Sequence, residues 1–277
     1  MKHSRKKVIV IKPDESWLKL NFRELVEFRD LFFFLTWRDI KVRYKQTIIG
    51  AAWAILQPLL TMVVFTVFFN RLAGLKSDGA PYELFSYAAL VPWQFFASGI
   101  TNSATSMVSN ERIITKVYFP RIIIPVSSIL SSLVDFALAF GVLIIMIFAF
   151  GMIPTINIIW LPLFLLLALV TAVGVGLWLA ALNVQFRDVR YVLPFLVQIW
   201  MFATPIAYSS SLLSEPWKTL YGINPMVGVV EGFRWALLGT ETRPGAIIIV
   251  SIGVSLLIFF SGLGYFQKME EQFADII

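Results

Sequence analysis

Long apolar runs separated by short polar loops dominate the chain from about residue 48 onward. Each run is close to the roughly twenty residues that an α-helix needs to cross a bilayer. The runs are continuous rather than alternating, a pattern that favours helices over a transmembrane barrel. We therefore predict an all-α integral membrane protein with six transmembrane helices, at residues 48–69, 85–108, 122–150, 156–181, 192–208 and 246–266.

Proline and charge mark two places where the pattern is irregular. Pro92 is expected to interrupt the second span, because proline removes a backbone donor. Between the fifth and sixth spans, residues 226–238 are apolar but too short to cross, and they carry Glu231 and Arg234. We predict re-entrant or interfacial helices in this region. A seventh span is the alternative.

A polar segment, residues 1–47, precedes the membrane domain of residues 48–277. Its apolar residues recur at spacings of three and four, the pattern of an amphipathic helix. The aromatic face and the basic run that follows place this helix at the membrane interface. A helix packed on a small soluble core is the alternative. The apolar stripe consists of Leu18, Phe22, Leu25, Phe28, Phe32 and Leu35.

The composition limits the possible functions. The chain is 58% hydrophobic and 14% charged, whereas soluble domains are about 25% charged. This excludes a cytosolic enzyme and a disordered chain, and six spans leave no room for a large catalytic domain. Cysteine is absent and His3 is the only histidine, so disulfides and cysteine-ligated metals are excluded and histidine catalysis or zinc binding is nearly so.

The distribution of lysine and arginine predicts the orientation, because these residues are retained on the cytoplasmic side. Eighteen of the 23 lie in the N-terminal segment, the loops 109–121 and 182–191, and the C-terminal tail. We therefore predict a multi-pass protein of the bacterial cytoplasmic membrane with both termini in the cytoplasm. This bias accounts for the net charge of +6, so no nucleic-acid partner is expected.

The predicted spans contain little that could drive transport or catalysis. Asp135 is the only acid well inside a span, and a helix–helix hydrogen bond is favoured over a relay or a near-interface position. The chain lacks the sequence G-x-x-x-x-G-K-[ST], so it cannot bind ATP by a P-loop. Ala172, Gly176 and Ala180 form a stripe of small residues that predicts close helix packing.

Two further patterns suggest contacts with other molecules. Residues 110–121 mix apolar and charged positions over about three helical turns. They predict either a short amphipathic helix that a soluble partner grips, or an ordinary loop on the lipid headgroups. Aromatic residues near span ends are typical of an interfacial belt. Some could instead line a translocation path, because sugar rings stack on aromatic faces, and the candidates are Trp53, Trp93 and Trp200.

Six short motifs stand in order along the chain. They are WRDIKVRYKQT at 37–47, GAAWAILQP at 50–58, VPWQFF at 91–96, KVYFPR at 116–121, LNVQFRDVR at 182–190 and INP at 223–225. Together they resemble the membrane subunit of ABC-2 type exporters. The resemblance is closest to the branch that exports lipid-linked polysaccharides such as O-antigen, capsule and teichoic acid, and it covers essentially the whole chain.

The resemblance implies a transport subunit rather than an enzyme, with six spans and re-entrant gate helices before the sixth. Two copies of the chain would form a channel at their interface. Two separate ATPase subunits would bind ATP and magnesium, so no cofactor is expected on this chain. The loop 109–121 resembles the coupling helix that seats in the ATPase. Its candidate coupling residues are Asn110, Glu111, Arg112, Lys116, Tyr118 and Arg121.

The expected substrate is a glycan on a polyprenyl-diphosphate carrier, which cannot cross lipid unaided because dehydration is too costly. Basic residues could attract the diphosphate, or they could set topology and contact membrane lipid. These residues are Arg38, Lys41, Arg43 and Lys45. Alternative functions are an ABC-2 exporter of drugs or simple lipids, a membrane-embedded polyprenyl-phosphate transferase, and an ion-coupled flippase.

Overall fold

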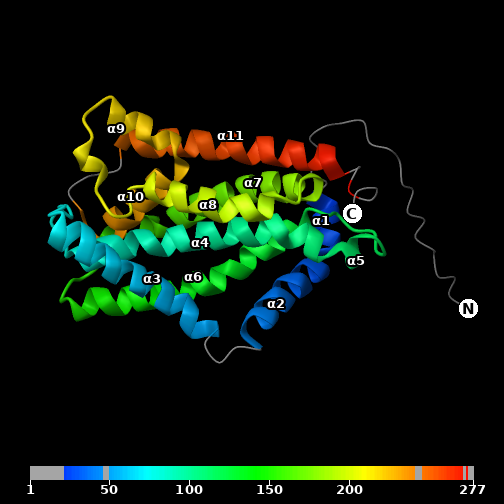
Figure 1. The fold of residues 1–277 in the computed structure, drawn as a ribbon, viewed down its shortest axis with the longest axis horizontal. Helices are drawn as coiled ribbons and strands as arrows, with labels where there is room; N and C mark the ends of the chain where they lie inside the picture. The colour runs from blue at the N-terminus through cyan, green and yellow to red at the C-terminus, as the bar shows by residue number, and fades with distance from the viewer. Residues whose placement is uncertain (1–21, 46–49, 241–244, 271–272, 274–277) are drawn as a thin grey trace, which may run out of the picture.

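The computed structural model describes residues 22–45, 50–240, 245–270 and 273, and this described part contains helices and loops but no strand. Long helices lie side by side along the long axis of the molecule (Figure 1). They are α3 (Gly50–Phe65) with its π-helical continuation η1 (Thr66–Leu72), α4 (Tyr82–Ser109), α6 (Ile123–Ala149), α7 (Leu161–Gln185), α8 (Val189–Phe202) and α11 (Gly245–Glu270).

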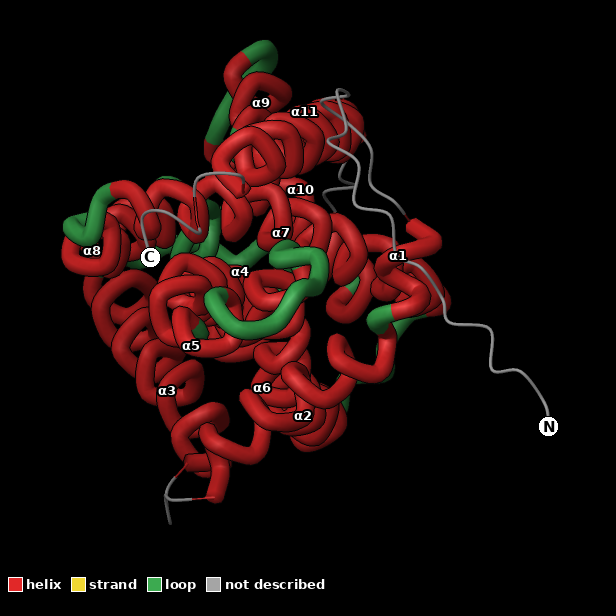
Figure 2. The backbone as a smooth tube through the Cα atoms, turned by 90° about the vertical axis from the view of Figure 1, so that its right-hand side faces the viewer, coloured by secondary structure: helices red, strands yellow, loops and turns green. Residues whose placement is uncertain are grey.

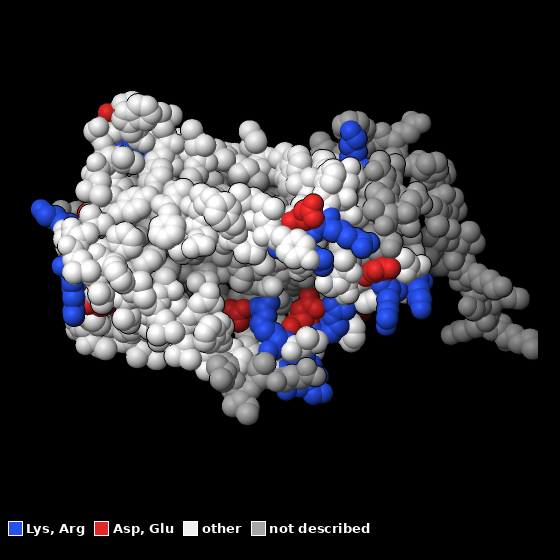
Figure 3. Space-filling view, in the orientation of Figure 1, with Lys and Arg blue, Asp and Glu red and all other residues white. Residues whose placement is uncertain are grey.

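The two ends of the bundle differ in charge. One end holds α5 (Glu111–Ile114) and the C-terminal end of α11, and we call it the basic end. On the visible face, charged side chains gather from about the centre to this end, a few lie at the opposite end, and the area between has almost none (Figure 3). The opposite end, which we call the far end, holds the short helix α9 (Trp217–Leu220). An uncharged belt between two polar ends is the surface of a membrane-spanning protein.

The centre of the bundle is α4, which is surrounded by α3, α6, α7 and α8 when the molecule is seen from the basic end (Figure 2). Twenty of its 28 residues are buried. The helix continues through Pro92, so the predicted interruption is wrong. A proline costs one backbone bond, and helices packed on every side hold the chain in place despite that loss.

Small residues bring α7 close to α4 and to α11. A Cβ atom on Gly176 would lie 2.7 Å from the hydroxyl of Ser103 on α4, and Ala172 and Ala180 are fully buried. A Cβ atom on Gly174 would lie 2.7 Å from backbone atoms of Phe259 on α11. The predicted packing stripe on this helix is therefore confirmed.

The region after the fifth predicted span is helical only in part. α8 ends at Phe202 rather than at residue 208, because residues 203–208 form turns around Pro205. Short helical turns follow at η3 (Ser210–Leu212), α9 and η4 (Tyr221–Ile223). The 226–238 element is confirmed as helix α10 (Pro225–Leu238), which is capped by Asn224 at its start and ends before Gly239 in the left-handed conformation.

The structure divides the predicted N-terminal helix in two. The structure has α1 (Phe22–Glu27) and α2 (Arg29–Lys45), with a turn at Phe28 between them. Within the stripe, Leu35 is buried, and Leu25, Phe28 and Phe32 pack against the core, while Leu18 lies outside the described residues. α2 therefore lays this stripe against α6, and the interfacial position stays a prediction.

Four helical segments of the described residues are long and apolar enough to span a membrane: 50–72, 123–149, 156–185 and 245–270. The third begins with the 3-10 helix η2 (Ile156–Trp160). α4 is long enough, but polar residues on its buried faces lower its hydropathy. α8 is apolar but has only 14 residues.

Candidate functional site

Two carboxylates join α2 to α6, and one of them, Asp135, lies halfway along α6. Asp135 on α6 accepts hydrogen bonds from Nη1 of Arg43 and from the hydroxyl of Tyr44. Nη2 of Arg43 also donates to Ser131 at 3.4 Å. Burial and the neighbouring carboxylate raise the pKa of Tyr44, so its hydroxyl remains a donor. These contacts make Asp135 a helix–helix hydrogen-bonding group, the role that the sequence favoured.

Asp39 forms the second tie between these helices. It accepts a hydrogen bond from Ser128 on α6 at 3.2 Å and pairs with Arg38 at 2.8 Å. Two of the four predicted diphosphate-binding residues, Arg38 and Arg43, are thus already paired with carboxylates. Lys41 and Lys45 are exposed, and the ammonium of Lys41 lies 5.9 Å from the Trp37 ring. The sequence pattern did not show that the two arginines are paired and the two lysines are exposed.

A cavity of about 420 Å³ opens beside Arg43, between α3, α4 and α6. Trp53 lines it from α3 and is 54% exposed. The lining is largely apolar, with polar groups supplied by Gln57, Gln94 and Ser98. A concave, mainly apolar site with a few polar groups and one ion pair at its edge is typical of ligand binding.

The other two candidate tryptophans lie elsewhere. Trp93 is 2% exposed and packs with its ring centroid 5.6 Å from that of Phe96. The ring centroid of Trp200 on α8 lies 4.9 Å from that of Phe96, and the indole N–H of Trp200 donates to Asn224 at 3.0 Å. The structure therefore places Trp93 and Trp200 in a core between α4 and α8, whereas Trp53 joins Arg43 at the cavity.

The loop at the basic end is less helical than predicted. α5 has four residues, so the expectation of about three helical turns is wrong, because turns take over before Pro120. Ile114 and Phe119 are buried and anchor the loop. Asn110 donates to the carbonyl of Ser106 at 2.8 Å and ends α4. Four of the candidate coupling side chains are exposed: Glu111, Arg112, Lys116 and Tyr118.

Arg121, the sixth candidate, is half-buried and bonds to Glu270, the last residue of α11. Its backbone N–H donates to the carboxylate of Glu270 at 3.0 Å. Its guanidinium Nη1 donates to the main-chain carbonyl of the same residue. The structure thus separates Arg121 from the exposed members of the predicted set.

A buried arginine organises the far end. Arg234 on α10 is 0% exposed in its side chain and lies 3.3 Å from a carboxylate oxygen of Glu231. It also donates to the carbonyls of Phe85 at 3.0 Å, Ile206 at 2.7 Å and Tyr208 at 3.4 Å. The guanidinium carbon lies 3.4 Å from the centroid of the Phe85 ring. The sequence showed these two charges but not their burial or their partners.

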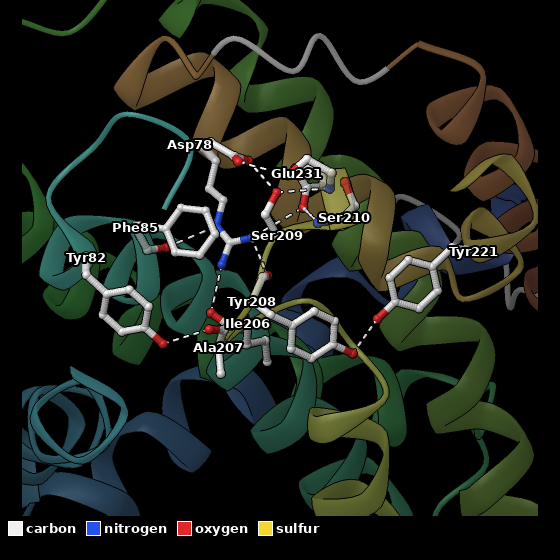
Figure 4. Close-up of polar contacts among 12 residues, drawn as sticks. Asp78, Tyr82, Phe85, Ile206, Ala207, Tyr208, Ser209, Ser210, Tyr221 and Glu231 are labelled. Atoms are coloured by element: carbon white, nitrogen blue, oxygen red, sulfur yellow. Dashed lines mark hydrogen bonds and ion pairs between the residues drawn. The ribbon is translucent and has the colours of Figure 1, made fainter. Parts of the chain in front are cut away.

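The surrounding polar groups complete this network, which Figure 4 shows in close-up. Asp78 accepts hydrogen bonds from Ser209 and, at 2.9 Å, from Ser211. The hydroxyl of Tyr82 donates to the carbonyl of Ala207 at 2.7 Å. Irregular backbone inside a membrane protein needs such partners, because lipid offers none. The network therefore allows residues 203–211 to leave the α-helical conformation where they are packed inside the protein.

These features define a class of protein. A helical bundle with an uncharged belt, charged ends and an irregular segment held inside the bundle is a multi-pass membrane protein of the transporter type. Groups of three or more potential metal ligands are absent from the described residues.

The comparisons specify the family. Residues 30–238 match the family model described as ABC-2 type transporter, so the chain belongs to the ABC-2 type transporter family. It is 30% identical over 250 residues to the O-antigen export system permease protein RfbA of Klebsiella pneumoniae, covering 90% of this chain and 95% of that relative. It is 29% identical to the RfbA protein of Myxococcus xanthus, covering 92% and 98%. It is 24% identical to the polysialic acid transport protein KpsM of Escherichia coli, covering 84% and 91%.

The family resemblance of the motifs is thereby confirmed. The chain is a permease, a transport subunit without a catalytic domain of its own. A permease of an ABC transporter implies a partner ATPase, which explains why the sequence lacks a P-loop.

Proposed function

We propose that this chain is the permease of an ATP-driven exporter of lipid-linked polysaccharide, of the O-antigen or capsule type, in the bacterial cytoplasmic membrane. The observation that carries the proposal is the similarity to O-antigen export permeases over 90% of the chain. Two copies of the chain would surround the path. Two ATPase subunits would bind ATP and magnesium, leaving this chain without a cofactor.

Six crossings with both termini in the cytoplasm fit the arrangement of the long helices. The loops at the basic end, residues 110–122 and 186–188, contain Arg112, Lys116, Arg121 and Arg187. Positive loops are retained in the cytoplasm, so the basic end would face the ATPase.

A re-entrant element fits the length of α8. Its 14 residues extend about 21 Å, short of a hydrocarbon core of about 30 Å. The chain then turns inside the protein, where Arg234 and Tyr82 donate to its carbonyls. Residues 203–238 would therefore enter and leave on the same side, as the outer gate of the path.

The cavity beside Arg43 supports a binding site for the lipid diphosphate at the entrance. Lys41 and Lys45 would attract the anion, and the diphosphate would replace Asp135 as the partner of Arg43. The apolar lining and Trp53 suit the adjoining isoprenoid and the first sugar. Trp93 is enclosed by its own chain, so this proposal depends on Trp53.

The four exposed coupling side chains at the basic end would contact the ATPase. We expect the charge reversals Glu111→Arg and Arg112→Glu to reduce its association, because charge complementarity fixes such contacts. Membrane insertion should be unaffected, since both side chains are exposed.

The test is reconstitution of the permease and its ATPase in vesicles, with a polyprenyl-diphosphate glycan supplied from outside. ATP-dependent protection of the glycan from an added glycosidase is expected, and the permease alone should give none. Transport of drugs or simple lipids with no transport of glycan would overturn the proposed substrate. Sugar transfer by the permease without its ATPase would favour a transferase, and export that stops when the proton gradient collapses while ATP remains would favour an ion-coupled flippase.

A further inference from the structure

Arg121 fixes the basic-end loop to the last long helix. The carboxylate of Glu270 accepts from the backbone N–H of Arg121 at 3.0 Å, and the Glu270 carbonyl accepts from its guanidinium. Both bonds join the loop after α5 to the final residue of α11. Nearby, Phe119 is buried and Phe273 packs 5.3 Å from Phe266, so both sides of this contact are anchored in the core.

α11 reaches from this contact to the far end of the bundle (Figure 1). Near its start, Ser251 donates to the carbonyl of Gly222 in η4 at 3.1 Å. Tyr221 in the same turn shares a hydrogen bond of 2.7 Å with Tyr208. One helix thus touches the loop proposed to meet the ATPase and also the turn attached to the irregular segment.

The middle of α11 is held firmly against α7. Thr171 and Ser255 form a buried hydrogen bond of 2.9 Å. A Cβ atom on Gly262 would lie 2.2 Å from the carbonyl of Gly174, so the two backbones are in direct contact. Close packing resists deformation, and therefore the pair shifts as one rigid unit.

We propose that Arg121 is a positioning residue that transmits movement of the basic-end loop to α11, and through α11 to residues 203–211 at the far end. This rests on the proposed function, because the movement originates in the ATPase. It differs from the family resemblance, which assigns Arg121 to the ATPase contact itself. The exposed residues of the loop would bind the ATPase, and Arg121 would act inside the permease.

The experiment follows the far end directly. The sequence has no cysteine, so a single cysteine at the exposed Leu212 reports the accessibility of that end to an impermeant maleimide. Labelling of the complex in lipid nanodiscs, which leave both faces open to the reagents, is measured with and without ATP and vanadate, alongside retention of the ATPase on the tagged permease. The variants are Arg121→Ala, Arg121→Lys and Arg112→Glu, with Arg29→Ala as the matched control because the Arg29 side chain is 77% exposed and lies outside the Arg121 contact.

We expect nucleotide to change the labelling rate in the parent chain and in Arg29→Ala, which removes an exposed arginine without touching the bonds between Arg121 and Glu270. In Arg121→Ala the change should shrink about fivefold, the factor for losing one hydrogen bond, while the ATPase stays bound. Arg121→Lys keeps one donor and should be intermediate, and it replaces Arg121→Ala if that variant does not fold. Arg112→Glu should lose the ATPase.

Three results would overturn the inference: no nucleotide response in the parent chain, a full response in Arg121→Ala, or loss of the ATPase from Arg121→Ala to the same extent as from Arg112→Glu. None of these readouts requires a glycan. Failure of glycan export in the parent complex with an intact labelling response would therefore count against the proposed substrate alone.

Discussion

Replacing the buried Arg234 with methionine tests whether the far-end network stabilises the fold. The change keeps an unbranched apolar side chain but removes the donors to Phe85, Ile206 and Tyr208 and the partner of Glu231. Removing one member of a buried ion pair costs about 3–5 kcal/mol. At about 2–4 °C per kcal/mol for a chain near this size, Arg234→Met should lower the Tm by about 6–20 °C.

The assay is thermal unfolding of the detergent-solubilised chain, followed by the amount of monodisperse protein that remains after heating. Arg112→Met is the matched control, because Arg112 is exposed and such a change costs within about 0.5 kcal/mol. The double variant Glu231→Met with Arg234→Met leaves no unpaired charge, so it should unfold at a higher temperature than Arg234→Met alone.

The stabilising role of Arg234 would be refuted if the Tm of Arg234→Met lay within about 2 °C of the parent value. By the same conversion that shift corresponds to less than about 1 kcal/mol. A double variant less stable than Arg234→Met would show that the buried carboxylate of Glu231 does not destabilise the fold when Arg234 is missing. Either result would also remove the physical reason for an irregular segment at residues 203–211.

Three further predictions concern the interior. Gly174→Val should prevent close approach of α7 and α11 and abolish the folded monodisperse peak, whereas Gly141→Ala, with nothing within 4 Å of the added Cβ, should leave that peak unchanged. The same peak from both variants would contradict the packing argument. Asp135→Asn should increase the rise in Tm caused by added farnesyl diphosphate, because the carboxylate no longer competes for Arg43. The same rise in Tm as in the parent chain would count against the proposed diphosphate site. Asn183→Ala removes a buried hydrogen bond of 2.9 Å to the carbonyl of Ala104, so it should lower the free energy of unfolding by about 1 kcal/mol in thermal unfolding. A more stable variant would show that burying the amide destabilises the fold.

Local patterns in the sequence predicted the long helices well. The apolar runs at 122–150 and 156–181 correspond to α6 and to η2 with α7, because burial in lipid or protein requires continuous apolar sequence. The predicted 226–238 element agrees with α10, although its capping residues, Asn224, Pro225 and Gly239, were not used in that prediction. Pro92 misled the prediction, because neighbouring helices compensate for its missing donor.

The polar ties could not be predicted, because they join residues far apart in the sequence. Asp135 is 92 residues from Arg43, and Arg121 is 149 residues from Glu270. Hydrophobic periodicity reports only which face of a helix is apolar, and it does not identify the facing helix. A weaker signal did exist, since one acid in an apolar span needs a partner of opposite charge or a hydrogen-bond donor.

The placement of these ties indicates how the bundle can move. Its middle is held by direct backbone contact, as at Gly174, and such contacts give no alternative arrangement of similar energy. The bonds of Arg121 lie instead at the basic end, and the ion pair of Arg43 lies at the edge of the cavity, so at these places partners can be exchanged for a subunit or a ligand. Exchange at such sites shifts whole helices rather than bending them. A permease built in this way would respond to its ATPase at the ends of its helices, while its core stays packed.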